Sequence, residues 1–357
     1  MTSELSTDER ELLIRSVRRL LEDRWPVERA VELANDVQAL RQFGGELRDL
    51  GLAELGAGDA PALREMLLIF EELGRASCPA PLIGTYLANR LFAADHADAQ
   101  AFFQMVRAGQ AVPAVALANF DGDRAAGSVL IDGGKLSGRT AFVESVGAAT
   151  HLIVLVSRPL GAAVVRLNES GVRTMPTPGL AVPPLSEIEL DCRAIVWQPT
   201  DADRLTDAAR VARLCSTARA LGAAQRAFDL ALAHAQVRRQ FGHLIGEFQA
   251  IQHKLADCLT RLEGTRLALA GGADACDRAD AAWRVFADAA IAFAGPALRQ
   301  VLLDAHHTLG AIGYAEEHEA PRHFRSVHAD LVRFGGTARA RAALADHLLA
   351  ASCAQER

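Results

Sequence analysis

The stretch that decides the fold is Arg238–Asp257, which reads "RRQFGHLIGEFQAIQHKLAD". Apolar residues recur through it at helical spacing, but glycines interrupt the rhythm at Gly242 and Gly246. Glycine allows backbone angles that other residues avoid, so a turn is expected there. The pattern predicts one helix that ends near Gln240 and a second helix that starts near Glu247.

The charged and polar residues of this stretch admit two interpretations. Arg238 and Arg239 would lie in the last turn of the first helix, where the helix dipole favours positive charge. Gln249 and Gln252 share one face of the second helix, because residues three apart are neighbours on a helix surface. Capping and solvation would explain all four side chains, and so would contacts with a ligand.

The sequence after about Leu205 is also helical in pattern. Ala- and Leu-rich segments carry Arg, Asp and Gln on their other faces, and Gly or Pro residues separate them. Helices of this length must bury their apolar stripes on one another, which predicts a helical bundle over residues 204–357. Within it, "GGADACDRAD" at Gly271–Asp280 is interpreted as a turn between two helices.

Residues 111–203 contain short Val-, Ile- and Leu-rich runs separated by Gly, Pro and Asp. Runs of this length and spacing are typical of strands, so this region is predicted to be a small β domain. Asp132–Lys135, "DGGK", is expected to form a hairpin turn because Gly133 and Gly134 can adopt positive φ.

Residues 1–110 return to helical spacing. Ser6 followed by Glu9 is a capping-box pattern at the start of an amphipathic segment, and Pro26 ends that segment. The chain is therefore predicted to be an α+β protein. An N-terminal helical domain at 1–110 is followed by a middle β domain at 111–203 and by the C-terminal bundle.

Composition and charge exclude several classes of protein. The 357 residues include 44 acids and 38 bases, a net charge of −6, and the bases are scattered, which argues against nucleic-acid binding. The six cysteines show no C-x-x-C spacing, which indicates a reducing compartment and no zinc site. His306 and His307 adjoin on a helix and cannot both face one metal. The N-terminus is charged, and no membrane-spanning segment is expected, so we predict a cytoplasmic protein without a metal site.

The whole chain resembles the acyl-CoA dehydrogenase family. Arg238–Asp257 matches that family's pattern "R-x-Q-F-G-x-x-I-x-x-F-Q-x-x-Q-x-x-L-A-D" at every spacing. Phe70–Leu82, "FEELGRASCPAPL", and Leu309–Ser326, "LGAIGYAEEHEAPRHFRS", are similar to two further family patterns. The resemblance implies the family's fold, in which a helical domain, a small β domain and a four-helix bundle follow one another.

The resemblance also implies FAD as cofactor, bound across a subunit interface. Arg238 would meet the pyrophosphate, since a guanidinium matches phosphate oxygens in a forked geometry, and Phe241 would lie against the adenosine part. A neighbouring chain's Leu309–Gly313 would complete the site, because glycines let backbone N–H groups approach a phosphate. At Ala311 the family has a glycine, and the added methyl could crowd a pyrophosphate. The candidate cofactor-binding residues are Arg238, Phe241, Gln249, His307, Leu309, Gly310 and Ala311.

The implied reaction removes two hydrogens from an acyl-CoA thioester and needs a carboxylate base for the proton α to the carbonyl. Most of the family has a glutamate in a "Y-E-G-T" stretch, where this chain has Phe334 or Gly335, depending on the alignment. Other members place the base on the first bundle helix, at a position that is Ala212 here. No catalytic residue is therefore predicted in this chain.

The loss of both bases resembles the short subunits of two-chain acyl-CoA dehydrogenases that act on bulky substrates such as sterol side-chain thioesters. In those enzymes one chain supplies the base, and the short chain supplies part of the FAD site. We therefore expect an acyl-CoA substrate and an oligomer, either a dimer or an α2β2 tetramer with another acyl-CoA dehydrogenase chain.

Two alternatives remain open. A non-redox or structural protein could use the same scaffold, because a fold does not fix a function. A self-sufficient homo-oligomeric enzyme would need a base from elsewhere, although each available acid is more readily interpreted as a solvated surface residue. The candidate acids are Glu144, Asp207, Asp330, Glu316 and Glu317. The middle domain also departs from the family pattern at Leu117–Ser128 and Gly138–Val146, which weakens the expectation of flavin contacts there.

Overall fold

The protein is described by a computed structural model that covers residues 5–57, 62–92, 97–117, 127–179 and 182–355. The chain forms two compact units, and each unit is built from three stretches of sequence. The first contains residues up to 13, 31–65 and 79–212, and the second contains residues 14–30, 66–78 and 213–357.

The N-terminal region is helical, as predicted. At the start of its first helix the Ser6 N–H donates to the Glu9 carboxylate (2.8 Å) and the Glu9 N–H donates to Ser6 Oγ (3.3 Å), which confirms the capping box. Asp36 caps a later helix by accepting from two backbone N–H groups. The helices of this region are α1 (Thr7–Arg24), α2 (Ala30–Asn35), α3 (Val37–Asp49), α4 (Leu63–Arg75), α5 (Leu82–Leu91) and α6 (Ala97–Arg107).

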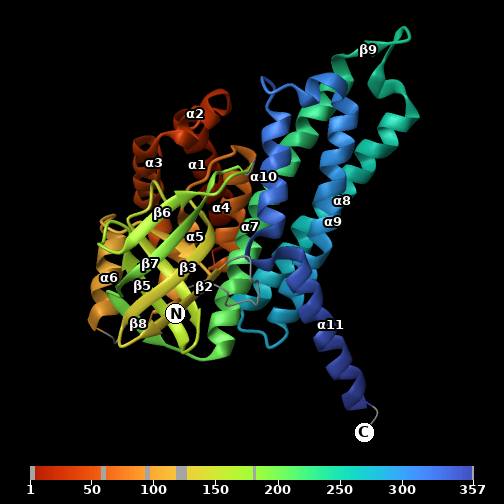
Figure 1. Cartoon of the computed structure of the whole chain (residues 1–357). Coiled ribbons are helices and arrows are strands. Elements are labelled where there is room, and N and C mark those ends of the chain that lie inside the picture. The colour runs from red at the N-terminus through yellow and green to blue at the C-terminus, as the bar shows by residue number, and fades with distance from the viewer. Residues whose placement is uncertain (1–4, 58–61, 93–96, 118–126, 180–181, 356–357) are drawn as a thin grey trace. The chain divides into compact units, whose positions relative to one another are not determined.

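The β region consists of β1 (Pro113–Ala116), β2 (Gly127–Asp132), β3 (Lys135–Glu144), β4 (His151–Ser157), β5 (Leu160–Arg166), β6 (Val172–Pro176), β7 (Leu185–Arg193) and β8 (Val196–Pro199). These strands form two four-stranded sheets, in the orders β1-β4-β5-β8 and β2-β3-β7-β6 (Figure 1). Only β1 and β4 pair in parallel among them. Apolar side chains of both sheets, such as Leu136 and Leu152, share one core.

The hairpin between β2 and β3 turns where the sequence predicts. Asp132 pairs with Lys135, and Gly133 and Gly134 have φ of 52° and 80°, which confirms the "DGGK" turn. β6 is a strand that the apolar pattern did not reveal. It lies at the edge of its sheet and is largely exposed, so its residues need not alternate between apolar and polar types.

A buried histidine makes the first unit sensitive to acid. His151 at the start of β4 is 3% exposed and packs against the Phe102 ring, with centroids 5.6 Å apart. Burial, together with the charge of Arg166, lowers the pKa of His151 to about 4. The unfolded chain therefore binds a proton between pH 6.5 and 4 that the folded chain does not, so stability falls as the pH falls through this window.

The expected loss over that window is on the order of 3 kcal/mol in the free energy of unfolding. This loss is measured by urea unfolding from pH 4 to 7, as the difference in the free energy of unfolding between wild type and His151→Gln. The titrations of all other groups cancel in that difference. The exposed His253→Gln serves as control and should leave the profile unchanged. A wild-type minus His151→Gln difference that stays constant with pH would contradict this expectation.

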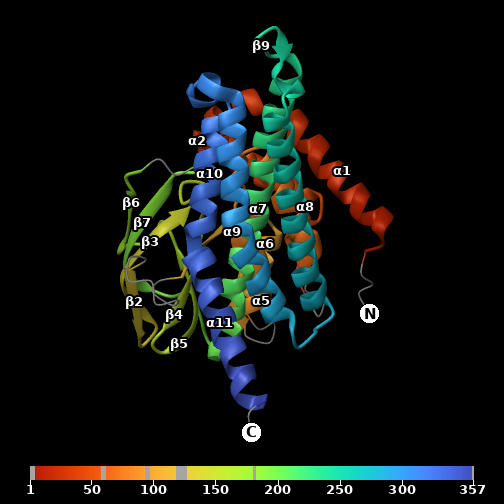
Figure 2. The ribbon, with the colours of Figure 1, turned by 90° about the vertical axis from the view of Figure 1, so that its right-hand side faces the viewer.

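The C-terminal region is a bundle of long helices, as predicted (Figures 1 and 2). Its helices are α7 (Ala202–Val237), α8 (Gln249–Asp277), α9 (Trp283–Leu309), α10 (Ala320–Val332) and α11 (Gly336–Gln355). In the second unit α9 packs against α8, α10 and α11. Gly271–Asp280 was predicted as a turn, and this is wrong for most of its length because α8 continues to Asp277. Gly272 instead allows α8 and α9 to pack closely, because a Cβ there would lie 3.2 Å from the backbone of Ala287 on α9.

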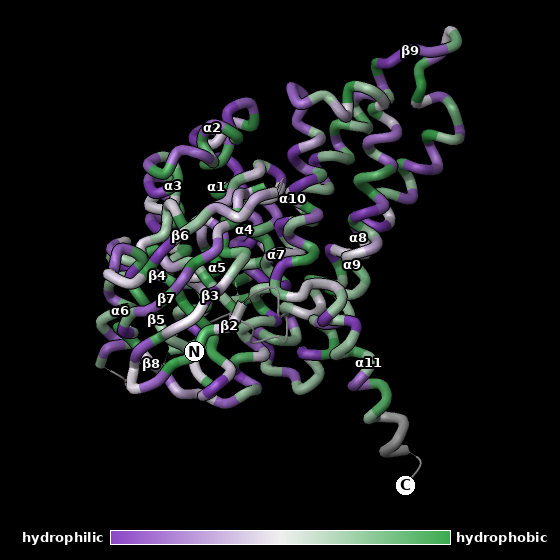
Figure 3. Tube along the Cα trace, in the orientation of Figure 1, coloured by the Kyte–Doolittle hydropathy of each residue, from purple (hydrophilic) through white to green (hydrophobic). Residues whose placement is uncertain are grey.

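One helical stretch is more apolar than the sequence analysis allowed. Trp283–Tyr314 is long and hydrophobic enough to cross a membrane by length and composition alone, which the sequence pattern did not reveal. More than half of its most apolar part is buried in the unit, where side chains such as Ile291 and Leu298 belong to the core. Figure 3 shows hydrophobic and hydrophilic residues alternating along the helices of the bundle.

In the second unit α4 and α7 cross with their backbones in contact. A Cβ on Gly222 of α7 would lie 1.8 Å from the carbonyl oxygen of Glu71, and one on Gly74 of α4 would lie 1.9 Å from that of Arg219. Real Cβ atoms are essentially never closer than 3.0 Å to such atoms. Both positions therefore require glycine, and the crossing fixes where α7 runs on toward Arg238.

Candidate cofactor site and base positions

The first part of the Arg238–Asp257 stretch forms a hairpin between α7 and α8, and its second part is the start of α8. α7 ends at Val237, and β9 (Arg239–Gln240) pairs antiparallel with β10 (His243–Leu244). Phe241 and Gly242 between them have φ of 52° and 82°. The prediction that the first helix reaches Gln240 is wrong, because Arg239 and Gln240 pair as a strand before the left-handed pair Phe241–Gly242 reverses the chain. α8 begins at Gln249, two residues later than expected.

The hairpin presents a cation and an aromatic ring outward. Phe241 is 90% exposed, and its ring lies roughly perpendicular to that of Phe248, with centroids 6.4 Å apart. Arg238 and Gln249 are exposed. The Arg238 guanidinium makes no hydrogen bond or ion pair with any residue that the structure describes. A hairpin that carries both an exposed aromatic ring and an available guanidinium suits a ligand with an anionic and a flat part.

The second candidate segment lies at the C-terminal end of α9. Gly310 caps this helix with φ 64° and ψ −141°, and a 3₁₀ turn follows at Gly310–Tyr314. His307 and Ala311 are exposed, whereas Leu309 is 4% exposed, so the Leu309 side chain belongs to the core. A Cβ on Gly310 would meet no atom within 4 Å, so the backbone is open to a ligand there. Figures 1 and 2 both place this segment at the same end of the second unit as the hairpin.

His306, next to candidate residue His307, has a structural role. Its Nδ1 lies 2.9 Å from the Leu302 carbonyl oxygen, and its ring packs edge-on against Tyr314 and Phe324. Burial lowers the pKa of His306, which keeps the ring neutral. The histidine therefore fixes the end of α9 rather than facing solvent.

The family's base positions carry no proton acceptor in their side chains. Phe334 has a left-handed backbone (φ 55°), and its carbonyl oxygen accepts a hydrogen bond from Arg213 Nε (2.7 Å). The Arg333 guanidinium lies over the Phe334 ring, 4.6 Å from its centroid. Gly335 has φ 78°, and Ala212 on α7 is fully buried. Backbone, aromatic ring and guanidinium groups thus occupy the segment in which the family resemblance implies a glutamate.

The interpretation of the remaining acids as solvated surface residues is wrong for two of them. Asp330 is fully buried and accepts hydrogen bonds from Arg219 Nε (2.9 Å) and Nη2 (2.5 Å). Glu144 is 8% exposed. Both acids turn inward because they have protein partners, which makes burial of a charge tolerable.

The other acids lie closer to solvent. Glu316 and Glu317 are exposed, as expected, and hydrogen bonds from Arg325 lower the pKa of Glu316. Asp207 is partly buried and pairs with Arg210 at 2.8 Å. A carboxylate held by arginine is a poor proton acceptor, so neither Asp207 nor Glu316 is suited to act as a base.

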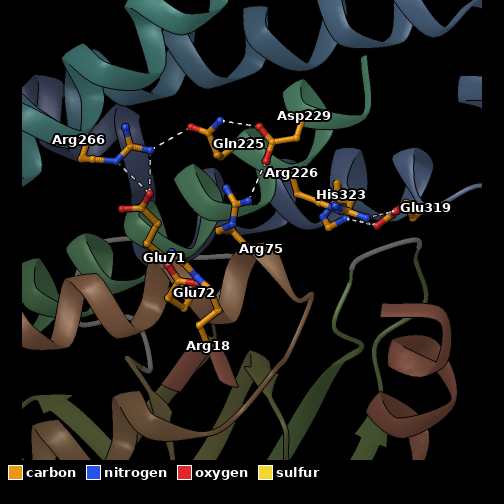
Figure 4. Close-up of polar contacts among 10 residues, drawn as sticks. All are labelled: Arg18, Glu71, Glu72, Arg75, Gln225, Arg226, Asp229, Arg266, Glu319 and His323. Atoms are coloured by element: carbon orange, nitrogen blue, oxygen red, sulfur yellow. Dashed lines mark hydrogen bonds and ion pairs between the residues drawn. The ribbon is translucent and has the colours of Figure 1, made fainter. Parts of the chain in front are cut away.

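The second unit also contains a polar network that the sequence motifs did not predict (Figure 4). Arg266 of α8 donates to Glu71 of α4 (2.8 Å) and to Gln225 of α7 (3.0 Å). Arg226 of α7 forms a forked pair with Glu319, the residue before α10, at 2.6 and 3.1 Å. Ion pairs from Arg18 to Glu72 and from Arg75 to Asp229 lie in the same unit. The only sequence signal was a set of charged residues on otherwise apolar helices.

The middle region was expected to lack the usual flavin contacts. In Leu117–Ser128, residues 118–126 lie outside the described residues. In Gly138–Val146 the pairing of β3 with β7 shifts register between Thr140 and Val143. The irregularity gives Phe142 a left-handed backbone (φ 61°) and leaves its side chain 39% exposed.

Comparison with known proteins agrees with this fold. Residues 203–349 match the family model of the acyl-CoA dehydrogenase C-terminal domain. Acyl-CoA dehydrogenase IpdE2 of Mycobacterium tuberculosis is 30% identical over 277 residues, which are 77% of this chain and 74% of that protein. The chain belongs to the acyl-CoA dehydrogenase family, an oxidoreductase family.

Solved structures share the same fold. The ChsE4–ChsE5 complex from Mycobacterium tuberculosis contains a chain that superposes with a TM-score of 0.82 at 20% identity, over 97% of this chain and 98% of that one. PigA, solved with FAD and proline, superposes with a TM-score of 0.80 at 18% identity, over 98% of this chain and 99% of that one. At these identities the structures support the fold alone.

Proposed function

We propose that this chain is a FAD-binding subunit of an acyl-CoA dehydrogenase whose catalytic base comes from a partner chain of the same family. The observation that carries the proposal is the contrast between two parts of the second unit. The hairpin keeps an available Arg238 and an uncovered Phe241. In the segment where the family resemblance implies the catalytic glutamate, Arg213 instead donates a hydrogen bond to the Phe334 carbonyl oxygen.

The features at the end of the second unit fit FAD. An exposed guanidinium can bind the pyrophosphate oxygens in a forked geometry, and the Phe241 ring can lie against the adenosine part. The open backbone at Gly310 of a neighbouring chain can approach the same phosphates, with His307 and Ala311 beside it. Because Ala311 is exposed, its methyl group lies on the surface that would meet the phosphates. Leu309 would support this segment from the core.

The reaction proposed for the complete assembly is α,β-dehydrogenation of an acyl-CoA thioester. FAD, when bound, supplies the acceptor for the hydride that leaves the β carbon. This chain's residues bind and orient that cofactor but take up no proton at the α carbon, because Phe334, Gly335 and Ala212 offer no basic side chain. A carboxylate of the partner chain has that role.

The assembly and its substrate follow from the same reasoning. We place the chain in a dimer or an α2β2 tetramer with another acyl-CoA dehydrogenase chain, and the two-component ChsE4–ChsE5 complex among the structures of this fold supports that choice. Bulky acyl-CoA thioesters of the sterol side-chain type are the proposed substrates. Four buried, reduced cysteines fit a cytoplasmic site of action.

Replacement of Arg238 by alanine tests the cofactor assignment. FAD binding is expected to weaken about 10- to 100-fold, because hydrogen bonds to a charged group contribute about 1.5–3 kcal/mol and each 1.4 kcal/mol is a factor of ten. The dissociation constant is measured by flavin fluorescence on the full chain and on its purified complex. Arg239→Ala is the matched control, since it removes the same charge one residue further on. Equal effects of the two variants would contradict the assignment.

The assignment of the base is tested by purifying the chain alone and together with the family member that copurifies with it. Bound oxidised flavin is detected by its absorption near ~450 nm, and turnover is measured with acyl-CoA thioesters. Turnover that requires the partner supports the proposal. A lone chain that binds FAD fully and dehydrogenates the thioester would show that it has its own base. A complex without flavin would favour a structural subunit.

A further inference from the structure

Glu319 is the point at which the segment between α9 and α10 is attached to α7. Its carboxylate accepts two hydrogen bonds from Arg226, from Nη2 at 2.6 Å and from Nε at 3.1 Å. His323 Nε2 lies 3.4 Å from the same carboxylate, and Arg322 Nη2 lies 3.8 Å away. The Glu319 side chain is only 18% exposed, and Figure 4 shows it together with Arg226 and His323.

The hydrogen bonds around Glu319 form a chain in which each group donates to the next, toward the Glu319 carboxylate. Arg322 Nε donates to Ser77 Oγ (3.2 Å), so the Ser77 hydroxyl proton is available for His323 Nδ1, also 3.2 Å away. His323 is fully buried, and burial lowers its pKa, which leaves a neutral ring whose Nε2–H points to Glu319. Every polar group that meets the Glu319 carboxylate is thus a hydrogen-bond donor.

The charge of Glu319 is maintained by these donors. Burial alone would raise the pKa of Glu319, but the hydrogen bonds of His323 and Arg226 outweigh it and hold the value at about 2. The carboxylate is therefore ionised throughout the physiological range. Through Ser77 the network is also connected to the end of α4. The left-handed backbone of Ser77 (φ 51°) turns the chain at that point.

Both halves of the proposed cofactor site are connected through this pair. Glu319 ends the segment that begins with Gly310, and Arg226 lies on α7, which leads to Arg238. Twelve residues of helix separate Arg226 from Arg238, about 18 Å at 1.5 Å per residue, so Glu319 cannot reach a ligand at Arg238. The pair instead fixes the position of one half-site relative to the other.

We propose that Glu319 is a positioning residue for the dinucleotide, an inference that rests on the proposed function. Each chain offers its hairpin to one cofactor and its α9–α10 segment to the cofactor of its neighbour. The distance between these two half-sites within a chain must therefore match the distance between two cofactors in the oligomer. The Glu319–Arg226 pair holds that distance by tying the α9–α10 segment to α7.

Glu319→Gln tests the proposal with almost no change of shape. Glutamine replaces one acceptor oxygen by an NH₂ group, which must face a donor of Arg226 or His323. FAD affinity is expected to fall about 10- to 100-fold, by analogy with metal sites that lose the hydrogen bonds supporting their ligands. The double variant Arg226→Gln and Glu319→Gln restores a pair of complementary amides, so its affinity should recover toward that of wild type.

The matched control is Glu316→Gln in the same segment. Glu316 also forms a forked pair, with Arg325, but it is 70% exposed and not attached to α7. All variants are made in the full chain, in the oligomeric state that carries flavin. FAD dissociation constants are measured at 15 °C, and circular dichroism and thermal unfolding are recorded in parallel. If Glu319→Gln does not fold, Arg226→Lys, which keeps the charge but loses the fork, is used in its place.

The outcomes separate this inference from the proposed function. Weaker FAD binding in Glu319→Gln but not in Glu316→Gln, with a folded spectrum, supports a positioning role. A lower unfolding temperature with unchanged FAD affinity means that Glu319 only stabilises the fold, and the inference is then wrong while Arg238→Ala still weakens binding. If Arg238→Ala itself has no effect on FAD, the proposed function fails first.

Discussion

Asp330→Asn is expected to lower the free energy of unfolding by about 3–5 kcal/mol, the usual result of removing one partner of a buried ion pair. Asp330 and Arg219 are both buried and joined by two short hydrogen bonds. The Asn amide would place its NH₂ group against the guanidinium and leave a buried charge without its counter-ion. Urea unfolding of the full chain measures the difference between the variant and wild type.

Two comparisons sharpen this expectation. Asp191→Asn breaks an exposed pair with Lys135, at 2.5 Å and 68% exposure of the Asp191 side chain, and should cost less than about 1 kcal/mol. The double variant Arg219→Met and Asp330→Leu replaces both charges by apolar groups and should recover much of the loss. The opposite pattern, an Asp330→Asn protein of unchanged stability that has lost turnover, would make Asp330 the base of a self-sufficient enzyme.

Gly222→Ala is expected to destabilise the protein by at least the upper end of the range of about 1–3 kcal/mol that overpacking usually costs. The new Cβ would lie 1.8 Å from the Glu71 carbonyl oxygen and 2.9 Å from the Arg75 backbone nitrogen. Because the obstacle is backbone, no side chain can move aside, and α4 must separate from α7. That separation would stretch the hydrogen bond from Arg75 of α4 to Asp229 of α7.

Gly271→Ala provides the contrast. Gly271 lies within α8, and a Cβ there would meet no atom within 4 Å. Alanine is a better helix former than glycine, so this variant should gain about 0.5–1 kcal/mol. Chemical unfolding of both variants gives the two values. Similar free energies for Gly222→Ala and Gly271→Ala would show that the close crossing of α4 and α7 does not constrain the fold.

Most of the fold could be predicted from patterns of residues close together in the sequence. The capping box at Ser6 and Glu9 and the glycine turn after Asp132 involve residues within four positions of each other, and both appear as expected. Gly272 was misinterpreted because a glycine that breaks a helix and a glycine that lets two helices approach look the same in a sequence. Only the contact with Ala287 distinguishes them.

The candidate site was predictable where it depends on one short stretch and not where it depends on distant partners. The exposed hairpin with Arg238 and Phe241 follows from a contiguous motif. Asp330 was taken for a surface acid because Arg219, which buries it, lies 111 positions earlier. Glu319 and Arg226 are 93 positions apart, and neither stands out in composition. A sequence gives residue types, but charge pairing across helices is set by packing.

The discontinuous second unit has a consequence for synthesis on the ribosome. Its segment 66–78 is translated 135 residues before Arg213 (213 − 78), where the α7 part of the unit begins. At about 5–20 residues per second this interval lasts roughly 7–27 s. During that time α4, whose Met66, Phe70 and Leu73 are fully buried in the finished protein, lacks α7 and the later helices of its unit. A nascent chain of this length therefore presents an apolar helix of the kind that chaperones hold.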